Sequence, residues 1–247
     1  MKTLLIAIVI ILLAFAGFQF IIKNRASYEA EIPELKKQAP VEGEVLVDTT
    51  LSETKTFNAP TAFATFDVAY PTFKNASVEF NQKIEDLVMS AVAEHKKIAE
   101  DTWRAQAETG GTPEEKFQFY ASWTPVQVND NYISVLLREG GYTGGAHGYE
   151  MLTSFNFDVM GEKEIVLSDL FPGDPNYLKA ISEFARKELR RQLKENLNED
   201  MLLPGTEPRD ENFSVFSFTP GSLTFYFQQY QVAPYAAGQS KVTMPRD

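Results

Sequence analysis

The amino-acid sequence predicts an α+β fold in which antiparallel sheets pack against two long helices, preceded by a single N-terminal transmembrane helix. Three observations carry this prediction. Two long segments repeat apolar residues at helical spacing, and the segments between them are rich in β-branched and aromatic residues. The strand segments that follow one another are joined by short turns, which indicates antiparallel pairing.

The N-terminal segment 1–25 is predicted to be a transmembrane anchor or a signal segment. Residues 4–22 carry no charge, and about 20 apolar residues span a bilayer as a helix. Ala14 and Ala16 offer a signal cleavage site, but the apolar run continues to Ile22, which favours an uncleaved anchor. We therefore expect a single-pass cell-membrane protein with its bulk extracytoplasmic or, alternatively, a protein secreted after cleavage.

Residues 26–44 are predicted to be a linker, because they are rich in Glu and Lys and are interrupted by Pro33 and Pro40. The segment has too few apolar residues to form a domain. Two α+β subdomains are expected to follow, an N-terminal one at 45–140 and a C-terminal one at 141–247.

The first strand segments are expected at 45–47, around Phe57 and at 62–70, where Pro71 ends the run. A long helix follows, with Asn75 or Ser77 as its cap. Its end is expected at the segment 110–113, which holds two glycines and a proline. The apolar stripe predicted to be its buried face consists of Ile84, Leu87, Val88, Ala91, Val92, His95, Ile98, Ala99 and Trp103.

A second long helix is expected between the strand pairs that follow. This helix should begin at Asp174 and Pro175, with the carboxylate as cap, and run to about Asn198. Its apolar face is Leu178, Ile181, Ala185, Leu189, Leu193 and Leu197. Strand pairs are expected at 117–128 with 132–138, at 153–159 with 164–167 and, after a polar loop at 199–212, at 213–218 with 223–227.

Composition excludes several classes of function. The chain has no cysteine, so it has no disulfide scaffold, thiolate metal site or cysteine nucleophile. Two histidines are too few for a typical catalytic zinc site, and no metal or cofactor is expected. A net charge of -11 argues against nucleic acid as a partner.

The glycine-rich segment 140–148 is the most unusual stretch of the sequence. It lacks the Lys-Ser or Lys-Thr of a phosphate-binding loop, and we expect its glycines to supply positive φ in a wide bend that also approaches a ligand or partner. His147 lies inside it and is a candidate contact residue, whereas His95 is expected to be a core histidine with its nitrogen satisfied. The candidate binding residues are Tyr142, Thr143, His147 and Tyr149 here, with Tyr230 and Tyr235 in the aromatic tail.

Motifs in the second half carry a resemblance to known proteins. They are residues 142–148, 154–158 and 167–171, followed by 225–227 and 232–238. This region resembles the paired domains of unknown function in the exported part of the lysozyme-sensing anti-sigma factor RsiV and the amino-terminal region of the peptidoglycan deacetylase PdaC. The resemblance implies an exported binding module. Unlike these proteins, the chain is expected to have no cytoplasmic sigma-binding segment before the span and no catalytic domain after Asp247.

The sequence therefore predicts a membrane-anchored extracytoplasmic binding module of the bacterial cell envelope, without catalytic residues. Its partner would be a lysozyme-like protein or a peptidoglycan fragment, with the membrane contacted through the N-terminal helix. An acidic surface would favour encounter with a basic lysozyme. Two alternatives stay open: an envelope glycan hydrolase that uses His147 as its acid-base group, and a structural envelope protein.

Overall fold

The computed structural model describes residues 46–108, 116–143 and 147–246. Every described residue belongs to one compact unit, which lies within Lys36–Asp247. The predicted anchor, the linker, the helix end at 110–113 and the centre of the glycine-rich segment lie outside the described residues. Among the described helices, none combines the length and apolarity needed to cross a bilayer.

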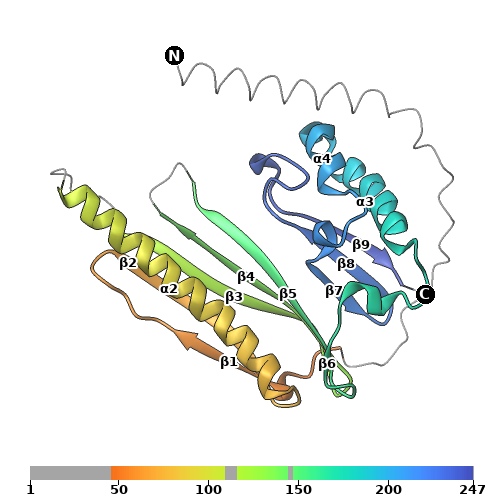
Figure 1. Cartoon of the computed structure of the whole chain (residues 1–247), viewed down its shortest axis with the longest axis horizontal. Coiled ribbons are helices and arrows are strands. Elements are labelled where there is room, and N and C mark those ends of the chain that lie inside the picture. The colour runs from red at the N-terminus through yellow and green to blue at the C-terminus, as the bar shows by residue number, and fades with distance from the viewer. Residues whose placement is uncertain (1–45, 109–115, 144–146, 247) are drawn as a thin grey trace. The chain divides into compact units, whose positions relative to one another are not determined.

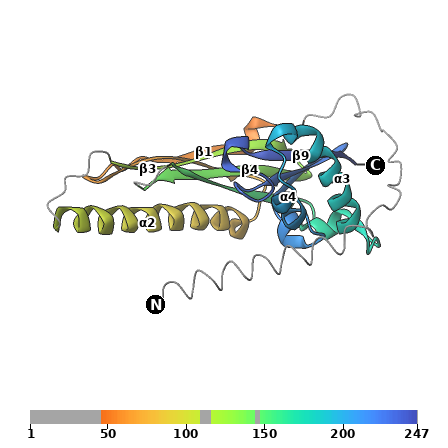
Figure 2. The ribbon, with the colours of Figure 1, turned by 90° about the horizontal axis from the view of Figure 1, so that it is seen from above.

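A six-stranded sheet, in the order β1-β2-β3-β4-β5-β6, forms the first half of the described chain. The long helix α2 lies along one face of this sheet (Figures 1 and 2). The elements are β1 (Ser52–Phe57), β2 (Ala64–Phe73), α2 (Val78–Glu108), β3 (Phe117–Val128), β4 (Tyr132–Tyr142), β5 (Tyr149–Asp158) and β6 (Lys163–Glu164), after the short 3₁₀ turn η2 (Thr49–Leu51). These bounds confirm the predicted helix and most of the predicted strands.

One strand pair corrects the prediction of purely antiparallel sheets. β2 and β3 pair in parallel, from Ala64 opposite Phe117 to Val68 opposite Ala121, while the other pairs of both sheets are antiparallel. The reason is the connection, because a long helix between two strands returns the chain to the same end of the sheet.

Pro71 does not end a strand, contrary to expectation. It lies inside β2, opposite Thr54 of β1. β2 pairs with β3 only between Ala64 and Val68, so its later residues have a neighbour on one side alone. A proline, which lacks the N–H, fits this half-free part of the strand.

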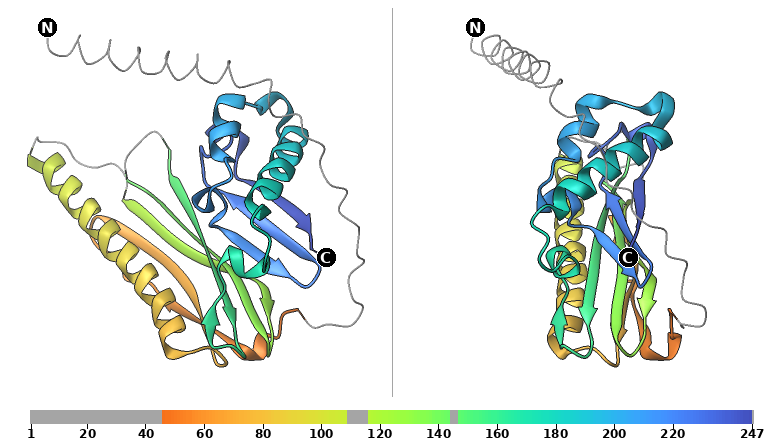
Figure 3. Two further views of the ribbon diagram at one scale, coloured as in Figure 1. Left: turned by 45° about the vertical axis from the view of Figure 1, so that its right-hand side comes forward. Right: turned by 90° about the vertical axis from the view of Figure 1, so that its right-hand side faces the viewer.

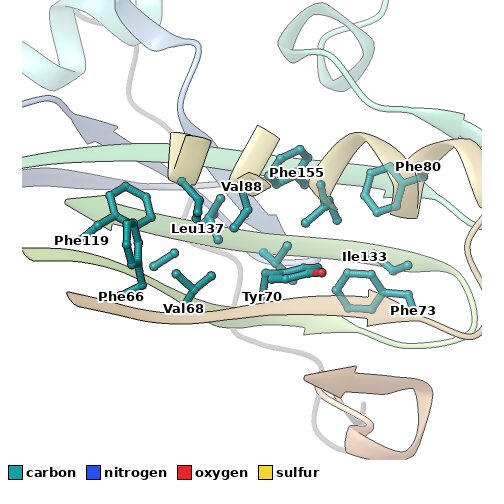
Figure 4. Close-up of a cluster of buried hydrophobic side chains, with 14 of the residues drawn as sticks. Phe66, Val68, Tyr70, Phe73, Phe80, Val88, Phe119, Ile133, Leu137 and Phe155 are labelled. Carbon is teal, nitrogen blue, oxygen red and sulfur yellow. The ribbon is translucent and has the colours of Figure 1, made fainter. Parts of the chain in front are cut away.

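The first core lies between the sheet and α2, and Figure 4 shows how its side chains meet. Phe80 of α2 packs 4.5 Å from Phe157 of β5, measured between ring centroids. The predicted helix face is confirmed in the main, but Ile98 is 43% exposed. The helix residues that are buried are Phe80, Ile84, Val88, Val92, His95 and Ala99.

The second half builds a three-stranded sheet, in the order β7-β8-β9, with α3 packed against it (Figure 3). Ile181, Leu189 and Phe225 are among the fully buried side chains of this second core. The elements are η3 (Leu167–Leu170), α3 (Tyr177–Leu193), η4 (Lys194–Asn196), α4 (Glu199–Gly205), η5 (Asp210–Phe213), β7 (Phe216–Thr219), β8 (Ser222–Phe227), η6 (Tyr235–Ala237) and β9 (Ser240–Pro245).

Three predictions for this half are wrong in detail. The helix begins at Tyr177, because the Asp174 carboxylate accepts the N–H of Asn176 and so forms a turn before the helix. The helix ends at Leu193, because the next residue, Lys194, has a φ of 47°. The loop expected to be irregular contains α4. β9 was not predicted, because its only large apolar residues are Val242 and Met244.

Side chains of the larger sheet hydrogen-bond to the backbone of β7. Asn156 donates from Nδ2 to the carbonyl of Phe216 at 2.9 Å and accepts from Ser134 at 2.7 Å. Ser134 in turn accepts the N–H of Phe218 at 3.1 Å. These buried groups attach the second half of the chain to the first. β4 spans position 140, where Gly140 pairs with Glu150 of β5, and the two cores are formed by residues within 64–157 and 165–244. The expected boundary between two subdomains at this position stays a prediction.

Candidate functional site

A cleft of about 270 Å³ lies where β3, β4 and β5 meet the segment that follows β8. The strands contribute polar and aromatic side chains, and the segment after β8 closes one side. The cleft is lined by Gln118, Tyr120, Gly141, Tyr142, Gly148, Tyr149, Glu150, Gln229 and Tyr235.

Gly140 and Gly141 shape this cleft, and they do so differently from the prediction. Both lie in β4, and the described glycines with positive φ are Gly173 and Gly238 instead. A Cβ atom on Gly140 would come 2.5 Å from the hydroxyl of Tyr120, and one on Gly141 would come 2.8 Å from the ring of His95. The glycines therefore allow side chains of other elements to lie directly against the strand, on both of its faces.

The Glu150 carboxylate is held by two donors at the wall of the cleft. Tyr120 donates its hydroxyl to Oε2 at 3.0 Å, and Arg138 donates Nη1 to Oε1 at 2.8 Å. The register places Tyr120 and Glu150 on either side of Gly140, which pairs with both. Burial and the hydrogen bond to Glu150 raise the pKa of Tyr120 to about 12, so its phenol stays protonated at neutral pH. The Glu150 carboxylate is thus a hydrogen-bond acceptor held in position next to the phenol of Tyr120.

Three aromatic rings gather next to the cleft. The imidazole of His147 stacks on Tyr235, with centroids 4.3 Å apart and an interplanar angle of 23°. Tyr230 lies 5.8 Å from Tyr235, and its hydroxyl is 3.3 Å from Nε2 of His147. His147 Nδ1 lies 2.8 Å from the carbonyl oxygen of Gly148, which can only accept, so Nδ1 carries a proton.

Two glutamine side chains hold the segment after β8 against β5. Gln228 accepts the N–H of Leu152 at 3.0 Å and donates to its carbonyl at 2.7 Å, as a neighbouring strand would. Gln229 accepts the N–H of Glu150 at 3.3 Å. The tyrosines of this segment are therefore positioned by hydrogen bonds to the sheet that carries the rest of the cleft.

Behind the cleft, Tyr149 contacts a buried histidine of α2. Its hydroxyl is 3.2 Å from Nδ1 of His95, which is 2% exposed. His95 Nε2 has no hydrogen-bond partner, so the expectation of a satisfied core histidine holds for one nitrogen only. Burial lowers the pKa of His95, and burial followed by the charge of Glu139 raises the pKa of Tyr149. Both groups are neutral at pH 7.

The structure brings most of the predicted site residues together. Tyr142, Tyr149 and Tyr235 line the cleft, and His147 and Tyr230 stack beside it. Thr143 follows directly after β4 and is not part of the lining. Sequence reasoning missed Gln118, Tyr120, Glu150 and Gln229. The alternation of β3 could have indicated the first two, since both fall on the face opposite the buried Phe117 and Phe119.

The described groups suit binding of a polar ligand with little net charge. The cleft combines flat phenol rings with one carboxylate whose charge is balanced by Arg138, and with two amide side chains. Within the described residues, no three His, Cys, Asp or Glu side chains gather in a way that could hold a metal ion. The ring nitrogens of His147 are engaged with a carbonyl and a phenol, rather than with a carboxylate.

Comparisons with known proteins match two parts of the chain. Residues 58–150 match the family described as deacetylase PdaC, and residues 168–247 match the family described as a protein of unknown function, DUF3298. The peptidoglycan-N-acetylmuramic acid deacetylase PdaC of Bacillus subtilis is 28% identical over 209 residues, which are 83% of this chain and 40% of the deacetylase. The resemblance to the deacetylase is thereby confirmed, and the resemblance to the anti-sigma factor stays a prediction.

Two further relatives come from Mycobacterium tuberculosis. An esterase is 29% identical over 113 residues, and the immunogenic protein MPT64 is 25% identical over 113 residues. Each match covers 46% of this chain and 48% of the relative. The chain therefore spans less than half the length of these relatives and of the deacetylase.

Two crystal structures share the fold. A member of the DUF3298 family from Bacteroides fragilis superposes with a TM-score of 0.57 at 20% identity, covering 78% of this chain and 89% of that protein. A DUF3298 family protein from Pseudomonas aeruginosa superposes with a TM-score of 0.54 at 19% identity, with the same coverage. At this identity the likeness concerns the fold alone.

Proposed function

We propose that this protein is a membrane-anchored, extracytoplasmic binding module of the bacterial cell envelope, and that its cleft binds a glycan fragment of peptidoglycan without cleaving it. The relation to a deacetylase named for peptidoglycan N-acetylmuramic acid supports an envelope setting. The uncharged run at 4–22 supports an anchor that leaves the folded part outside the cytoplasm.

The observation that carries the proposal is the pairing of phenol rings with a fixed carboxylate in one cleft. Tyr120 and Tyr235 are 36% and 38% exposed and so present ring surface to solvent. Glu150 is held between Tyr120 and Arg138. A sugar ring has apolar C–H faces and hydroxyl edges, which match an aromatic face and a nearby hydrogen-bond acceptor respectively.

The amide side chains of Gln118 and Gln229 complete this lining and suit an N-acetylated sugar. Each can donate to an acetamido carbonyl or accept from its N–H. The balanced charge of Glu150 and Arg138, together with the chain's net charge of -11, disfavours strongly anionic glycans.

The test is a calorimetric titration of the full chain, in a mild detergent, with the soluble disaccharide of N-acetylglucosamine and N-acetylmuramic acid. We expect saturable binding that Tyr235→Ala and Glu150→Gln each weaken about tenfold or more, as the loss of an aromatic or charged anchor would. Matched controls are Tyr177→Ala on α3, and Glu188→Gln, whose carboxylate also pairs with an arginine, Arg191, at 2.8 Å. Both controls should bind as the unmodified chain does.

Three results would overturn the proposal. The first is no saturable binding, or equal binding by the cleft variants and the controls. The second is retention of a basic lysozyme at low salt without any glycan binding, which would favour protein recognition through the acidic surface. The third is steady release of cleaved glycan that His147→Ala abolishes, which would favour the hydrolase alternative.

A further inference from the structure

A second cavity, of about 370 Å³, lies at the opposite end of the long strands, where the six-stranded sheet meets β7. Its wall comes from the adjoining ends of β3 and β4, the β5–β6 turn, η3, the β7–β8 turn and the end of β9. It is lined by Gln127, Tyr132, Asp158, Lys163, Ile165, Asp169, Leu170, Phe218, Pro220 and Arg246.

Gln127 is the most buried residue of this wall. It is 0% exposed, and neither Nε2 nor Oε1 of its amide has a hydrogen-bond partner. An unmatched buried amide costs free energy, so such a group in a native fold calls for a partner that the chain does not supply. The register of β3 against β4 shifts between Pro125 and Gln127, and a bulge of this kind redirects a side chain.

The charged groups around the cavity are unequally engaged. Asp158 accepts the N–H of Gly161 at 2.9 Å, and Asp169 accepts the N–H of Val166 at 3.0 Å, so both carboxylates hold turns. Neither Lys163 nor Arg246 forms an ion pair with any described residue. The guanidinium of Arg246 lies 5.6 Å over the ring of Phe218 at the wall. Two cations thus face the cavity without a partner anion.

We propose that this cavity binds the carboxyl end of an N-acylated amino acid or short peptide. A secondary amide offers one N–H and one C=O together, which are the two groups that the Gln127 amide lacks. A terminal carboxylate would pair with Arg246 and Lys163. Ile165, Leu170 and Pro220 provide an apolar wall for a small aliphatic side chain.

Other ligand classes fit this wall less well. A polyphosphate or nucleotide would bring several negative charges beside the carboxylates of Asp158 and Asp169. The two cations of the cavity are too few to neutralise all of these charges. A water molecule could satisfy the Gln127 amide, but it would leave Arg246 and Lys163 without an anion. The proposal concerns a site separate from the glycan cleft and does not depend on it.

The probe is N-acetyl-alanyl-alanine, titrated into the full chain in a mild detergent, with its C-terminal carboxamide as the matched ligand. We expect saturable binding of the acid, about tenfold weaker binding of the carboxamide, and about tenfold weaker binding of the acid by Arg246→Gln. Gln127→Leu should weaken binding to a similar degree while retaining the native melting curve, because it removes the buried polar atoms that lack partners.

Arg209→Gln is the matched control, because Arg209 is an exposed arginine outside the cavity that pairs with Glu207 at 2.6 Å. It should bind the acid with unchanged affinity. Absence of saturable binding, equal binding of acid and carboxamide, or equal binding by Arg246→Gln and the unmodified chain would each overturn the proposal. Should Gln127→Leu fail to fold, the arginine variant and the carboxamide decide the outcome. Carboxylate-dependent binding that Gln127→Leu leaves unchanged in a native fold would overturn the role of its amide.

Discussion

The imidazole of His147 lies stacked on the phenol ring of Tyr235, with their centroids 4.3 Å apart. The first residue follows β4 and the second begins η6, so the contact joins two segments far apart in the chain. Tyr230 reinforces it through the 3.3 Å contact between its hydroxyl and Nε2 of His147. Together these rings form one border of the proposed glycan cleft.

We predict that His147→Ala weakens disaccharide binding about three- to tenfold, because the stacked ring that supports Tyr235 is lost. The melting temperature should change little, since His147 is exposed. Calorimetric titration and a thermal melt measure the two effects. His147→Phe retains a ring for stacking and should recover most of the affinity, whereas a catalytic role would not be rescued by Phe.

Gly140→Ala should lower the free energy of unfolding by about 1–3 kcal/mol, as overpacking does. The new Cβ would lie 2.5 Å from both the hydroxyl of Tyr120 and the backbone carbonyl of Tyr149. Gly221→Ala is the matched control, because a Cβ there meets nothing within 4 Å, and its effect should stay within about 0.5 kcal/mol. Chemical denaturation of both variants measures the difference. Equal stability of the two would contradict the close packing at Gly140.

Asn156→Ala should destabilise the fold by about 1–3 kcal/mol, because it leaves the buried carbonyl of Phe216 and the hydroxyl of Ser134 without their partner. Asn176→Ala is the control, since its side chain makes no capping hydrogen bond at the start of α3. Urea denaturation reports both variants. If both variants lost a similar amount of unfolding free energy, the hydrogen bonds of Asn156 between the sheets would contribute no more stability than a surface asparagine does.

The stability of the protein should decrease as the pH falls below about 6.5, partly through His95. Burial lowers the pKa of this side chain from its ordinary value of 6.5, so the unfolded chain binds a proton in a range where folded His95 stays neutral. The contribution of His95 to stability is complete above pH 6.5 and is lost as the pH falls below that value. Melting temperatures of the unmodified chain and His95→Gln between pH 5 and 8 test this, and parallel curves would rule out the effect.

At high pH, Tyr120 should contribute a second decline in stability. Its pKa is raised from 10.0 to about 12 in the folded protein, so ionisation is easier in the unfolded chain between these values. The stabilisation is complete below pH 10 and is lost as the pH rises through about 12. Tyr120→Phe should show a shallower decline than the unmodified chain in this range. Tyr177, whose pKa is also raised to about 12, contributes equally to both curves.

Local patterns were sufficient to predict much of the architecture. The apolar stripes of α2 and α3 indicated buried faces that the structure confirms in the main. The errors arose where a partner outside the segment decides the outcome. β2 continues through Pro71 because its pairing with β3 ends at Val68, so the missing N–H of the proline costs no hydrogen bond to β3. β9 forms because β8 offers it an edge that β7 leaves unpaired.

The sequence by itself determined the α+β class and the buried helix faces, because each depends on residue types at fixed spacing along the chain. Only the tertiary structure decided which residues share a cleft. Tyr120 and Glu150 meet because the register of three strands places them on either side of Gly140, which has no Cβ. The Gln127 amide lacks a partner because a bulge directs this side chain toward the junction between the two sheets. Register and bulge position depend on contacts between distant segments, which spacing within one segment does not encode.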